Sequence, residues 1–76
     1  MIKLWLKSNS KDIVKYQYQA ESGPIGEVLY SKSRKATRID NKLDDFPDFY
    51  YQSLHSELMK WGEKDKFPEK NTIAWG

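Results

Sequence analysis

The hydrophobic period of this chain changes once along its length, near residue 45, and that change constrains the fold more than any other feature. Between residues 2 and 40, apolar and polar side chains mostly alternate, which is the period-two pattern of half-buried strands. After residue 45, apolar side chains recur every three or four residues, which indicates an amphipathic helix. The sequence therefore predicts an α+β fold with its strands first and one helix behind them.

Four strands are expected before the helix. Alternation predicts strands over residues 2–7 and 14–21, joined by a polar hairpin turn from Ser8 to Asp12. A second turn is expected over Ser22–Gly26, with Pro24 at its first central position and Gly26 at its end. Residues 27–31 and 36–40 then read as a third and a fourth strand, of which the fourth has the weaker pattern.

The helical segment begins near Asp45, where Asp44 or Asp45 is placed to cap it and Asp48 adds negative charge to the first turn. Gly62 is expected to end the helix. A short last strand is predicted over residues 71–75. The stripe that should face the sheet consists of Phe46, Tyr50, Leu54, Leu58 and Trp61. The predicted order is β-β-β-β-α-β, an antiparallel sheet of four to five strands with one helix packed on one face.

Length and composition indicate the number of domains and the cellular compartment to expect. A chain of 76 residues suits a single domain over residues 1–76. The absence of cysteine excludes disulfides and thiolate metal sites and is typical of reducing compartments. The first residues alternate apolar and basic side chains and lack the apolar run of a signal peptide, and no stretch is long enough to span a membrane. A cytoplasmic protein without membrane contact is the expectation.

No pattern of catalytic or ligand-binding residues emerges. The G-x-x-G string at 23–26 lies between predicted strands and lacks the Lys-Ser/Thr pair of a phosphate-binding loop. The carboxylates of Asp44, Asp45 and Asp48 suit a helix start better than a metal site, because no EF-hand pattern is present. His55 is the sole histidine, and no nucleophile motif accompanies it. We therefore expect a non-enzymatic protein with no cofactor and no metal.

Charge is distributed unevenly. Residues 1–42 contain nine basic and four acidic residues, whereas residues 43–76 contain four basic and seven acidic ones. This asymmetry fits an anionic partner for the basic half, and it equally fits two halves of one fold that attract each other.

The predicted architecture leaves one sheet face without a helix, and this face yields the leading functional hypothesis. Because side chains alternate between the two faces of a strand, Trp5 and Leu29 are expected on that face, with Lys3, Lys15 and Gln17 around them. Three adjacent aromatics, Phe49 to Tyr51, cannot all be buried by one helix face, so at least one of Phe49 and Tyr51 should lie at the edge of the core or be exposed. The hypothesis is a protein-binding module, with self-association included. Its candidate partner-binding residues are Trp5, Leu29, Tyr51, His55 and Met59.

Nucleic-acid binding is the alternative hypothesis. An aromatic ring among lysines is the kind of surface on which single-stranded bases stack while cations meet phosphates. The candidate nucleic-acid-binding residues are Lys3, Trp5, Lys7, Lys15, Arg34, Lys35 and Arg38. A third possibility is that the C-terminal segment, with Phe67 and Trp75, covers Trp5 and leaves no platform there.

Overall fold

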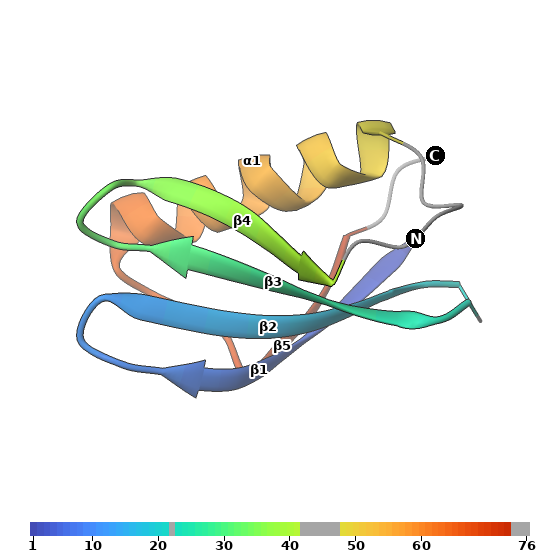
Figure 1. Cartoon of the computed structure of the whole chain (residues 1–76), viewed down its shortest axis with the longest axis horizontal. Coiled ribbons are helices and arrows are strands. Elements are labelled where there is room, and N and C mark those ends of the chain that lie inside the picture. The colour runs from blue at the N-terminus through green and yellow to red at the C-terminus, as the bar shows by residue number, and fades with distance from the viewer. Residues whose placement is uncertain (22, 42–47, 74–76) are drawn as a thin grey trace.

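A computed structural model describes residues 1–21, 23–41 and 48–73. Its elements are β1 (Ile2–Asn9), β2 (Ile13–Ala20), β3 (Ile25–Ser31), β4 (Ala36–Asn41), α1 (Asp48–Lys64) and β5 (Lys70–Ile73). The strands form one antiparallel sheet in the order β4-β3-β2-β1-β5, and α1 lies across one face of it (Figure 1). The predicted α+β architecture and its β-β-β-β-α-β order are confirmed.

Strand register explains which side chains enter the core. Leu4 of β1 lies opposite Tyr18 of β2, and Tyr16 of β2 lies opposite Val28 of β3. Because opposite residues share a face and alternate residues do not, every second side chain of these strands points toward α1. The resulting core, in which each side chain is at most 2% exposed, consists of Ile2, Leu4, Val14, Tyr16, Tyr18, Val28, Tyr30, Leu54 and Leu58.

The helix packs on this face through the predicted stripe. Leu54 and Leu58 are fully buried, and the ring of Trp61 lies 5.2 Å from that of Tyr16. The ring of Tyr51 meets that of Tyr18 edge-on, whereas Phe49 is 51% exposed. One of these two aromatic side chains is therefore exposed, as predicted. Phe46 and the capping residues Asp44 and Asp45 lie outside the described residues.

The predicted helix end at Gly62 is wrong, because α1 continues to Lys64. Asp65 adopts a left-handed φ of 52°, its N–H donates to the Gly62 carbonyl, and the Lys66 N–H donates to the Trp61 carbonyl. These two bonds form a Schellman motif with Asp65 in the position that glycine usually occupies. Gly62 has another role, since a Cβ there would collide with the hydroxyl and ring of Tyr30. Glycine at this position lets the helix approach the sheet.

The second predicted turn is also misplaced. The chain reverses at Glu21, which has a φ of 57°, and the Gly23 N–H donates to the Ala20 carbonyl. Pro24 follows the reversal, and Gly26 lies within β3 opposite Tyr18. A Cβ at Gly26 would collide with the Tyr18 ring, so this glycine makes room for a buried aromatic side chain.

After α1 the chain crosses the helix-covered side before it joins the sheet. The Phe67 ring packs 5.8 Å from that of Tyr30, and the Tyr16 hydroxyl donates to the Pro68 carbonyl at 2.6 Å. β5 then pairs with β1, with Ile2 opposite Ile73. Phe67 therefore lies on the side of the helix, away from the face of Trp5, while Trp75 falls outside the described residues.

Candidate binding surface

The face of the sheet turned away from α1, called the outer face below, contains the alternate residues of each strand. Three cross-strand rows define it, and no described element lies over it. The rows are Lys3–Gln19–Ile25, Trp5–Gln17–Glu27, and Lys15–Leu29–Arg38. The structure thus brings Lys3, Trp5, Lys15, Leu29 and Arg38 onto one surface, as the alternation predicts.

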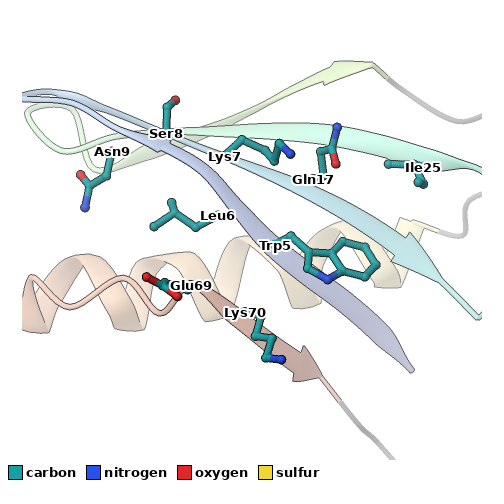
Figure 2. Close-up of a pocket in the computed structure, with 9 residues that line it drawn as sticks. All are labelled: Trp5, Leu6, Lys7, Ser8, Asn9, Gln17, Ile25, Glu69 and Lys70. Carbon is teal, nitrogen blue, oxygen red and sulfur yellow. The ribbon is translucent and has the colours of Figure 1, made fainter.

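A groove runs along the seam between β1 and β5. One hollow is lined by residues 5–9 of β1 together with Gln17, Ile25, Glu69 and Lys70 (Figure 2). A second hollow adjoins it and shares Trp5 and Lys70, with Lys3 and Thr72 on its other side. Together these two hollows form what we call the Trp5 groove. Its central wall is the half-buried indole of Trp5, which lies opposite Lys70 in the register.

The groove forms because β5 pairs with only the first part of β1, from Ile2 to Trp5, whereas β1 continues to Asn9. The Leu6 N–H donates to the Glu69 carbonyl at 2.7 Å, at the point where the chain arrives from Pro68 on the other side of the sheet. At the same point the register of β1 against β2 shifts between Leu6 and Ser8, which makes Lys7 the extra residue of a β-bulge. A bulge bends and twists its strand, and here it places Lys7 along the hollow beside Trp5 (Figure 2).

Charge on the outer face is partly compensated. The Lys15 ammonium lies 3.0 Å from the Glu27 carboxylate, and both side chains are about two-thirds or more withdrawn from solvent. Lys15 is therefore a weaker contributor of positive potential than the sequence suggested. Lys3, Lys7 and Lys70 are exposed and make no ion pair with any residue in the described ranges. Unpaired positive charge on this face therefore lies at Lys3, Lys7 and Lys70 around Trp5, and also at the exposed Arg38 of β4, which makes no ion pair with another described residue.

Arg34 and Lys35 lie elsewhere, in the β3–β4 turn at the end of the sheet (Figure 1). That turn is held by Asp12, whose carboxylate accepts the Ser33 N–H at 2.8 Å and the Ser31 hydroxyl at 3.2 Å. Hydrogen bonding from Ser33 is the main cause that lowers the pKa of the Asp12 carboxyl below its ordinary value. The structure therefore divides the seven predicted nucleic-acid-binding residues between the outer face and this separate turn.

The predicted partner-binding set is divided as well. Trp5 and Leu29 share the outer face, but Tyr51, His55 and Met59 lie on α1, on the other side of the sheet. Tyr51 and Met59 are half-buried against the core. His55 is exposed, and its Nδ1 lies 2.8 Å from the Thr37 hydroxyl of β4, beside a shallow hollow between helix and strand. The helix flank is thus largely engaged in packing, and the outer face is the more available surface.

Several residues of the Trp5 groove are not among the predicted site residues, and Ile25, Glu69 and Lys70 are the most informative of them. Ile25, which is 49% exposed, falls within the predicted second turn, and Glu69 and Lys70 precede the predicted last strand. Extending the alternation of Leu29 and Glu27 by one more step reaches Ile25, so the signal for this residue was present. No local pattern places Lys70 opposite Trp5, because that pairing depends on the path of the chain through Pro68.

Comparisons with known proteins identify no relative: no family model matches the chain, and neither a curated protein nor a solved structure shows significant similarity. Among the described residues, no helical segment has the length and hydrophobicity that a membrane span requires. In the same part of the chain, no three side chains of His, Asp or Glu gather as metal ligands would. The surface of the molecule is therefore the guide to its function.

Proposed function

We propose that this chain is a small non-enzymatic binding module that contacts a protein partner through the outer face of its sheet, centred on Trp5. The observation that carries the proposal is the one-sided packing of the sheet. A single helix covers one face, and the other presents an indole, Ile25 and Leu29 among amide side chains. Aromatic and aliphatic side chains set among polar groups are typical of protein interfaces.

The distribution of charge supports a protein over a nucleic acid as the partner. Strongly basic domains are the usual electrostatic signature of nucleic-acid binding, and this chain has a net charge of only +2. On the outer face, Glu27 neutralises Lys15 within the same surface that a nucleic acid would have to cross. A second carboxylate, Glu69, lines the groove itself. Arg34 and Lys35, which would strengthen a basic track, lie away from Trp5.

Site-specific photo-cross-linking in the native cells tests this proposal. A photoreactive side chain in place of Gln17, next to Trp5, should yield discrete protein adducts. The matched control carries the same group in place of Gln52, an exposed residue of α1, and should yield few. Adding Trp5→Ala to the Gln17 variant should abolish its adducts while the circular dichroism spectrum stays that of a folded protein.

Two results would contradict the proposal. Adducts that disappear on nuclease treatment would assign the face to nucleic acid. Equal adducts from the Gln17 and Gln52 positions would show that the outer face has no special role.

A further inference from the structure

We infer that the Trp5 groove binds an acidic peptide segment in extended conformation, with an aromatic or aliphatic side chain of that segment packed on the Trp5 indole. The inference rests on the proposed function and specifies the chemistry of the partner. It combines three features of the groove: the length of the groove, the position of its one aromatic wall, and the sign of the charge around it.

The length of the groove suits an extended chain. Its two hollows follow β1 from Lys3 to Asn9. Six steps along a strand of this kind span roughly 20 Å, so about six residues of an extended peptide fit alongside. Trp5 lines both hollows, which places the indole near the middle of such a peptide. Peptides that bind a surface groove usually pack one apolar side chain into it and make polar contacts on either side of that side chain.

The charge of the groove selects an acidic peptide. Lys3 and Lys7 lie two positions before and after Trp5 in β1, Lys70 lies opposite Trp5 in β5, and none of the three makes an ion pair with another described residue. Glu69 is the one acidic side chain among the residues that line the two hollows. Carboxylates on either side of an apolar residue would therefore meet ammonium groups on either side of Trp5.

The same charges argue against a second copy of the chain as the occupant. A symmetric dimer places the same patch on both partners, so the lysines of one groove would lie close to the lysines of the other. Like charges across an interface cost free energy, and no excess of acidic side chains in the groove compensates for them.

Amide NMR titration of the whole chain with defined probes tests the inference. The first probe is a blocked ten-residue peptide with one central Phe among Asp and Glu residues. The second has the same length with Asn and Gln replacing the acids, and the third is a ten-nucleotide oligothymidylate. The acidic peptide should shift the Trp5 indole N–H and the amides of residues 3–9 and 70–72, and should bind at least tenfold more tightly than the neutral peptide.

Matched charge variants separate the groove from general electrostatics. A triple Lys3→Gln, Lys7→Gln, Lys70→Gln variant should weaken binding of the acidic peptide at least fivefold. A control triple that removes the same charge at exposed sites elsewhere, Lys11→Gln, Lys64→Gln, Lys66→Gln, should change it less than twofold. Trp5→Ala should weaken it about tenfold without loss of the folded spectrum.

Several outcomes would overturn the inference. They are equal binding of the neutral peptide, equal effects of the two triples, shifts away from the groove, and tighter binding of the oligothymidylate. A failed peptide titration combined with protein adducts from the Gln17 position would refute the acidic-peptide chemistry and leave the proposed function standing. Nuclease-sensitive adducts would refute both.

Discussion

Replacement of Gly62 by alanine should destabilise this protein, although the same change in most helices stabilises. In an exposed helix interior, alanine is favoured over glycine by roughly 0.8–1 kcal/mol. Here the new methyl group would collide with the hydroxyl and ring of Tyr30, a side chain that is only 2% exposed and has little room to move. Overpacking of this kind costs roughly 1–3 kcal/mol. Because the ring is enclosed, we expect the upper part of that range and a net loss of roughly 1–2 kcal/mol after the propensity gain.

Urea denaturation followed by circular dichroism measures this effect. Ser56→Ala, at an exposed position of the same helix, is the control and should stabilise by a few tenths of a kcal/mol, roughly 0.5 at most. The decisive comparison repeats Gly62→Ala in a Tyr30→Leu background, where the ring is absent. There the substitution should become neutral or stabilising, and the two effects should be strongly non-additive.

Stabilisation by Gly62→Ala in the wild-type background would refute the reasoning. It would mean that α1 does not approach the sheet at Tyr30, and the assignment of a helix-covered and an outer face would then need revision.

Three further predictions concern local features of the fold. Lys35 has a φ of 51°, so Lys35→Gly should raise the free energy of unfolding by about 0.5–1 kcal/mol, seen as a later urea midpoint. The pKa of Asp12 is lowered by hydrogen bonds from Ser33, so its stabilising effect is present above the ordinary value of 3.8 and disappears as pH falls through the folded-state pKa. The stabilities of wild type and Asp12→Asn, compared by denaturation from pH 7 to pH 2, should therefore converge at the acid end. Burial raises the pKa of Tyr18 well above its ordinary 10.0, so stability is full below pH 10 and falls as pH rises further. Tyr18→Phe should make that alkaline decline shallower by up to about 1.4 kcal/mol per pH unit.

The sequence predicted those features of the fold that depend on periodicity. Alternation along β1 and β2 predicted that Leu4 and Tyr16 lie in the core and that Trp5 and Gln17 lie outside it. The prediction holds because every second side chain of a strand points to the same face of the sheet. The stripe of α1 was predicted for the same reason. Such signals are local and repeat several times, so one irregular residue does not obscure them.

The errors arose where tertiary packing decided the role of a residue. Gly26 and Gly62 were assigned to a turn and a helix end, the usual sites of glycine, yet both make room for buried tyrosine rings. Conversely, Glu21 and Asp65 occupy left-handed positions where glycine would be expected. The sequence predicted only part of the Trp5 groove, because Lys70 lines it through a non-local strand pairing that no sequence pattern encodes.

Solvent accessibility of the Trp5 indole is the most direct test of the central claim that the outer face is open for binding. Proton relaxation enhancement by a soluble gadolinium chelate should strongly broaden the Trp5 indole N–H and the side-chain amides of Gln17 and Gln19. The methyl groups of Leu54 and Leu58, which are fully buried, should keep their relaxation rates. Protection of Trp5 to the level of those methyl groups would show that the face is covered and would contradict the proposed binding surface.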